Sequence, residues 1–128
     1  MSITYQLEKN KDFPFAFSQA LRAGDLVFVS GQVGDDLENF DVVGDTIEEQ
    51  TKQCLKNVEL ILAEVGLTLD HVVRVSAYLS HPEDFDKFNQ VYSEVFKKPY
   101  PARITGYVDM KDYLIEMEII ADATSVRE

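Results

Sequence analysis

Residues 46–79, TIEEQTKQCLKNVELILAEVGLTLDHVVRVSAYL, join a helix pattern directly to a strand pattern. Residues 46–49 have the spacing of a capping box, which satisfies the free backbone amides at a helix start. Gly66 is the residue type that commonly ends a helix in a left-handed conformation. Residues 72–79 then alternate with a period of two, which predicts a strand. Between the cap and the glycine, apolar residues at three- and four-residue intervals predict one buried stripe: Ile47, Cys54, Val58, Ile61, Leu62 and Val65.

The residues before this unit predict strands and a loop. Alternation over residues 3–7 indicates a short first strand, residues 16–22 a weaker one, and Leu26–Gly31 a strong one. Two glycines and a run of acids over residues 34–45 indicate a long surface loop.

The residues after it predict a second helix and two more strands. Pro82 opens the helix, which extends to about Phe96. Prolines at positions 99 and 101 prevent its continuation and direct residues 102–108 into an extended segment. A turn at 109–112 precedes a final strand at 113–121. The order ββ(β)-α-β-α-ββ predicts an α+β sandwich with two helices on one face of a sheet.

One face of this sheet lacks a cover within the chain. Leu26–Val29 is apolar on both faces, and the last strand interleaves Ile115 and Ile119 with Leu114 and Ile120. We therefore expect the uncovered face to meet another copy of the chain in a homo-oligomer.

Composition sets the broad class. The 128 residues are 45% hydrophobic and 27% charged, which predicts one globular domain over residues 1–128. The net charge of −11 is a poor match to a phosphate backbone, so we expect no nucleic-acid partner. The single cysteine, Cys54, fits a reducing compartment. With neither a signal-like start nor a long apolar run, the sequence predicts a cytoplasmic protein without a membrane partner.

Neither a metal site nor a phosphate loop is expected. His71 and His81 fall at opposite ends of one strand, about 30 Å apart at ~3.3 Å per residue. Neither has the short spacing of a zinc site. Residues 30–34, SGQVG, match no phosphate-binding pattern. We therefore expect neither a metal site nor a phosphate-binding loop.

The carboxy-terminal strands carry the most informative polar residues. If they form a hairpin centred on residues 110–111, Thr105 lies opposite Glu116 and Arg103 opposite Glu118, with all four side chains on one face. One interpretation is a structural ion pair. The other is a site in which the guanidinium binds a carboxylate and a glutamate holds or deprotonates water.

Five short segments resemble the Rid family of reactive intermediate deaminases, also called the YjgF family: residues 17–20 (FSQA), 29–32 (VSGQ), 88–89 (FN), 101–103 (PAR) and 115–117 (IEM). The resemblance implies a chorismate-mutase-like α+β sandwich with a mixed sheet and two helices on one face. It also implies a homotrimer with ligand clefts between subunits.

The resemblance further implies cofactor-free hydrolysis of reactive enamines and imines, such as 2-aminoacrylate and 2-iminobutanoate, to 2-keto acids and ammonia. By position, Arg103 would bind the substrate carboxylate and Glu116 would place the attacking water. Ser30 and Gly31 would line the pocket, and Asn89 would contribute from a cleft wall.

Several residues depart from the family pattern and indicate a divergent subgroup. Phe17 stands where such deaminases carry a tyrosine, and Thr105 where they carry a cysteine; both are retained as substrate-binding residues. Ile104 and Gly106 also depart from the usual types. Two alternatives stay open: a Rid-like hydrolase with another substrate, and a trimeric module that binds a small carboxylate metabolite without turnover. The net charge argues against a ribonuclease.

Overall fold

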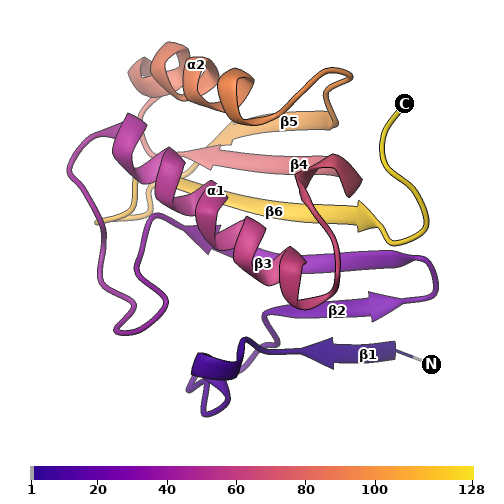
Figure 1. Cartoon of the computed structure of the whole chain (residues 1–128). Helices are drawn as coiled ribbons and strands as arrows, with labels where there is room; N and C mark the ends of the chain where they lie inside the picture. Colours follow the sequence, from indigo (N-terminus) through magenta and orange to yellow (C-terminus); the bar gives the residue numbers. More distant parts are fainter. Residues whose placement is uncertain (1) are drawn as a thin grey trace.

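The computed structural model describes residues 2–128 and is built on one six-stranded mixed sheet (Figure 1). The order across the sheet is β1-β2-β3-β6-β4-β5. The strands are β1 (Ser2–Tyr5), β2 (Ala20–Ala23), β3 (Leu26–Val33), β4 (Val72–Leu79), β5 (Ala102–Tyr107) and β6 (Ile115–Asp122). The helices are α1 (Ile47–Glu64) and α2 (Phe85–Val95), with 3-10 turns at Glu8–Asn10, Leu69–His71 and Pro82–Asp84.

Both helices lie on the same face of the sheet, so the predicted α+β arrangement is confirmed (Figure 1). The capping box of α1 is also confirmed: the Thr46 hydroxyl accepts a hydrogen bond from the Glu49 amide at 3.2 Å, and the Glu49 carboxylate accepts one from the Thr46 amide at 3.3 Å. The predicted stripe of α1 is buried except for Val65, which is partly exposed. The second helix begins later than predicted, because Pro82–Asp84 forms a 3-10 turn.

The predicted hairpin between residues 102–108 and 113–121 is wrong. Strand β5 pairs with β4 in parallel, and β6 pairs antiparallel with both β3 and β4. β4 therefore separates the two segments. The reason lies in their apolar patterns, because β6 buries every second residue fully whereas β5 buries none. The strand with more apolar surface takes the central position, and the more polar strand takes the edge.

The face of the sheet opposite the helices carries exposed apolar side chains. Alternation with buried residues places Leu26, Phe28 and Ile104 on that face, and each is at least 40% exposed. An exposed apolar surface of this kind supports the expectation of an interface with another copy, which stays a prediction.

Arg127 connects the carboxy-terminal segment to two loops. Its guanidinium donates hydrogen bonds to the carbonyl oxygens of Leu69 at 2.6 Å, Val72 at 2.8 Å, Lys97 at 3.0 Å and Pro99 at 2.6 Å. One side chain thus holds the segment before β4 against the segment before β5.

We expect Arg127→Ala to lower the free energy of unfolding by about 2 kcal/mol, since charge-assisted hydrogen bonds to four carbonyls are lost. Urea denaturation at fixed protein concentration measures the change. Arg22→Ala is the control, because within residues 2–128 the Arg22 side chain donates only to the Gly24 carbonyl, at 3.0 Å on the surface. Equal losses in the two variants would contradict the role given to Arg127.

Candidate functional site

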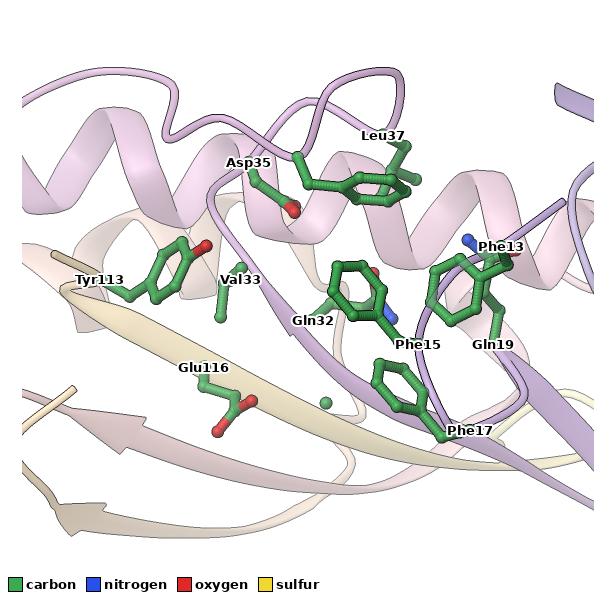
Figure 2. A pocket seen from close by; sticks show the side chains of 12 residues that line it. Phe13, Phe15, Phe17, Gln19, Gln32, Val33, Asp35, Leu37, Tyr113 and Glu116 are labelled. Atoms are coloured by element: carbon green, nitrogen blue, oxygen red, sulfur yellow. The ribbon is translucent and has the colours of Figure 1, made fainter. Parts of the chain in front are cut away.

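A cavity of about 220 Å³ lies where the segment before β2 and the loop after β3 approach the start of β6 (Figure 2). Its wall consists of phenylalanine rings, two carboxyl groups, two amides and a tyrosine. The lining residues are Phe13, Phe15, Phe17, Gln19, Gly31, Gln32, Val33, Asp35, Leu37, Phe40, Tyr113 and Glu116.

A β-bulge in β3 shapes the floor of this cavity. Val29 pairs with Ile119 and Gln32 with Met117, so β3 has one residue more than β6 over this interval. A Cβ atom on Gly31 would lie 2.7 Å from Oε2 of Glu116. The carboxyl group of Glu116 therefore lies directly over the glycine backbone, in space that any other residue at position 31 would fill.

Glu116 is partly buried, and its environment changes its acidity. Burial, and to a smaller extent the negative charge of Glu118, raise the pKa of the Glu116 carboxyl above its usual value. A raised pKa lies closer to neutral pH, where a carboxyl can both accept and donate protons during a reaction.

Ser30 fixes the segment before β2 to the bulge. Its hydroxyl donates to the Ser18 carbonyl at 2.6 Å, and its amide donates to the Gln19 carbonyl at 3.0 Å. The Gln19 side chain is buried and accepts from the Leu7 amide at 2.8 Å. These bonds hold the phenylalanine-bearing residues 13–17 beside Gly31, so Ser30 contributes to the site by positioning them.

Asp35 is a second carboxyl in the cavity wall and is only 7% exposed. Burial raises its pKa to about 6, with a smaller contribution from Asp36; hydrogen bonds from its own backbone amide and from Asn57 act in the opposite direction. The Asn57 amide donates to its Oδ1 at 3.0 Å. Asp35 and Tyr113 direct their oxygen atoms toward the same part of the cavity (Figure 2).

Arg103 lies at a different cavity, of about 390 Å³, beside α2. Its guanidinium carbon is 4.6 Å from the ring centre of Tyr92, 5.4 Å from that of Phe88 and 5.8 Å from that of Phe85. The buried Tyr92 hydroxyl has no hydrogen-bond partner within residues 2–128. Burial raises the pKa of Tyr92 to about 12, although Arg103 and Arg127 act in the opposite direction. Aromatic faces thus pack against the cation, and its N–H groups can donate hydrogen bonds to a ligand.

The structure places five of the sequence-predicted site residues in these two cavities, and Ser30 and Thr105 line neither. Phe17, Gly31 and Glu116 line the first, while Asn89 and Arg103 line the second. Ser30 lies behind the first cavity, as described above.

The expectation that Arg103, Thr105, Glu116 and Glu118 share one face is wrong. Arg103 and Thr105 pair with the buried Val75 and Ala77, and so lie on the helix-covered face. Glu116 and Glu118 alternate with buried residues of β6, and so lie on the opposite face.

Sequence reasoning missed much of the first cavity. Asp35 and Phe40 lie in the stretch interpreted as a surface loop, while Phe13 and Phe15 lie in an irregular segment before the weak second strand. The signal available was three phenylalanines at alternate positions, 13, 15 and 17, which indicates one apolar surface in an extended segment.

The structure defines an α+β protein with two cavities, one lined by Glu116 and one by Arg103, and comparison with known proteins gives the family. The family model described as endoribonuclease L-PSP matches residues 12–123. A RutC family protein from Pyrococcus abyssi is 46% identical over 107 residues, 82% of this chain and 84% of the relative. The chain therefore belongs to the Rid/YjgF family, which includes the RutC and L-PSP proteins.

Solved structures agree with this assignment. YyfA of Yersinia pestis, a protein of the conserved Rid family, superimposes with a TM-score of 0.86 at 30% identity, covering 95% of this chain and 99% of YyfA. TdcF of Escherichia coli with bound serine superimposes with a TM-score of 0.77 at 28% identity, covering 89% of this chain and 90% of TdcF.

The described part of the chain, residues 2–128, contains no helix long and apolar enough to cross a membrane. Within the same residues, no cluster of three or more histidine, cysteine or acidic side chains has a geometry that could hold a metal ion. A fission yeast relative, Mmf1, 38% identical over 110 residues, is a mitochondrial protein. The cytoplasmic location therefore stays a prediction.

The raised pKa of Asp35 predicts a pH-dependent stability difference between Asp35→Asn and the wild type. The folded state holds the Asp35 proton up to about pH 6, whereas an ordinary aspartate releases it near 3.8, so wild-type stability falls as pH rises through this interval. We expect Asp35→Asn to be more stable than the wild type by about 2 to 3 kcal/mol at pH 7.5, and equally stable near pH 3.

Chemical denaturation at the two pH values measures this difference. Glu59→Gln, on the exposed outer face of α1, controls for the loss of one negative charge. A stability difference between Asp35→Asn and the wild type that is the same at both pH values would contradict the assignment.

Proposed function

We propose that this protein hydrolyses reactive 2-imino acids and their enamine forms to 2-keto acids and ammonia, in sites formed between subunits of a homotrimer. Each site would combine the Glu116 cavity of one subunit with Arg103 of its neighbour. The observation that carries the proposal is the presence of two complementary half-sites on opposite faces of one sheet. One half offers a carboxyl of raised pKa, and the other offers a guanidinium packed against aromatic rings.

The Glu116 half-site suits the proton transfers of imine hydrolysis. Water adds to the imine carbon while the carboxylate accepts a proton from the water, and the carboxyl then gives that proton to the imine nitrogen. Collapse of the resulting carbinolamine forms the carbonyl and breaks the carbon–nitrogen bond, so that ammonia leaves. Each proton taken by the carboxyl returns to the departing nitrogen, and the reaction consumes only water.

Arg103 suits the second requirement, which is to hold the substrate in register. A guanidinium binds a planar carboxylate through two parallel hydrogen bonds, and its fixed fork also sets the orientation of the carboxylate. Such positioning lowers the entropic part of the barrier. Serine bound in the TdcF structure is an amino acid that carries the same carboxylate.

The acidic lining of the first cavity argues against RNA cleavage as the activity. The first cavity presents Asp35 and Glu116, and no lysine or arginine lines it. Together with the net charge of −11, this arrangement repels a polyphosphate chain.

The second candidate is a binding module without turnover. Phe17 favours it, because a phenylalanine ring in the cavity wall supplies no hydroxyl to orient water or substrate. Stabilisation by a 2-keto acid without ammonia release would support this candidate over the hydrolase.

The test is ammonia release from 2-aminoacrylate and 2-iminobutanoate, each generated in place by a dehydratase. We expect the wild type to accelerate release, and Arg103→Ala and Glu116→Gln each to lose at least about 100-fold in rate because positioning or proton transfer is removed. Light scattering should show the same oligomer for both variants. Unchanged turnover in Arg103→Ala would overturn the role of Arg103.

Mixing the two inactive variants tests whether the site spans two subunits. After unfolding and refolding together in equal amounts, the mixture should recover about a quarter of wild-type activity, because roughly one site in four then pairs an intact Arg103 with an intact Glu116. Activity no higher than that of either variant alone would overturn the shared site.

A further inference from the structure

We propose that Phe13, Phe15, Phe17 and Phe40 form the substrate's side-chain pocket, and that it selects imino acids with an aromatic side chain over small ones. The reaction in this inference rests on the proposed function, whereas the ligand preference rests on the first cavity alone. We call these four residues the phenylalanine cluster.

The cluster is built from edge-to-face contacts. Phe13 meets Phe15 and Phe17 with ring centres 5.1 Å apart and interplanar angles of 72° and 81°. Phe40 meets Phe15 at 5.1 Å and 82°. Phe15 and Phe17 are nearly parallel, at 15° and 5.9 Å, and lie one beside the other along the cavity wall (Figure 2). Rings in these arrangements accept a further ring by the same edge-to-face or offset-stacked contacts.

The cluster leaves apolar surface uncovered. Phe15 is 47% exposed and Phe17 is 49% exposed, although both line a cavity. A methyl or ethyl side chain would cover little of this surface, whereas an aromatic ring would remove most of it from water. Glu116 lines the same cavity, so a side chain on the cluster would leave the imine carbon near the carboxyl.

The loop after β3 places Phe40 at an energetic cost. Phe40 has a φ of 61°, a left-handed conformation that is unusual for a bulky residue. The loop holds it through hydrogen bonds from the Asp36 amide to the Asp41 carbonyl at 2.8 Å and from the Phe40 amide to the Asp36 carbonyl at 2.9 Å. Asp35 and Val42 close the loop by a β-bridge. Backbone strain retained beside a cavity is consistent with a ring placed for binding.

The test compares imino acids generated in place from phenylalanine, alanine and lysine by an amino-acid oxidase with catalase. We expect catalytic efficiency on the phenylalanine-derived imine to exceed that on the alanine-derived one at least tenfold. Phe15→Ala should reduce this ratio at least tenfold, because the ring of the phenylalanine-derived imine loses more contact than a methyl group does. Phe40→Gly is a second variant that removes a ring while relieving the left-handed strain. Leu60→Ala, on the exposed face of α1, is the control and should preserve the ratio.

Three outcomes would overturn the inference. The first is equal catalytic efficiency on the three imines. The second is a preference for the lysine-derived imine, which would assign substrate selection to Asp35, and the third is dissociation of the oligomer by Phe15→Ala, which would make the phenylalanine cluster a subunit interface. Binding separates this inference from the proposed reaction. If no imine is hydrolysed but phenylpyruvate stabilises the wild type far more than pyruvate does, and Phe15→Ala abolishes the difference, the pocket stands and the reaction fails. If imines are hydrolysed without regard to side chain, the reaction stands and the pocket fails.

Discussion

The central position of β6 is the constraint on which the rest of the structure depends. This last strand inserts between β3 and β4, although both precede it in the chain. It buries Ile115, Met117 and Ile119 completely against the helices. The same alternation turns Glu116 toward the other face, beside the bulge of β3. The core and the candidate site therefore share one strand. A shift of its register by one residue would turn the core side chains to the open face and Glu116 toward the helices.

The bulge in β3 makes room for the candidate acid, Glu116, on the neighbouring strand β6. An extra residue in β3 interrupts the ladder at Ser30 and Gly31, and the missing side chain of Gly31 leaves the space that the Glu116 carboxyl occupies. Space for the carboxyl comes from a glycine, while its raised pKa comes from partial burial and from a like-charged neighbour. A local irregularity in the backbone of β3, together with the glycine in it, thus makes room for the Glu116 carboxyl on the neighbouring strand.

The sequence predicted the elements well and their pairing poorly, for a physical reason. Helix caps, periodicity and proline positions are local signals, and they identified α1, β3 and β4 close to their observed bounds. Strand pairing depends on competition between partners far apart in the chain. Residues 109–112 resemble a hairpin turn, yet the crossover through α2 gives β5 a parallel partner in β4. The resemblance to the Rid family supplied Arg103 and Glu116 as candidates, but only the register shows that they lie on opposite faces. Phe40 reaches Phe13 and Phe15 through tertiary folding, which no spacing rule indicates.

The opposite-face arrangement has a consequence for regulation of the proposed activity. Within one subunit, the sheet itself separates Arg103 from Glu116, so no side-chain rotation brings them together. In a subunit alone, the cavity that binds the substrate carboxylate would thus lack the group that holds the attacking water, and the cavity that holds the water would lack the guanidinium. Hydrolysis would then require assembly of the oligomer. The acidic first cavity lacks the positive charge that a carboxylate substrate needs, and only the neighbouring subunit would supply it. Because Arg103 is held by the rings of Phe85, Phe88 and Tyr92 rather than by a loop, it would reach that neighbour already oriented.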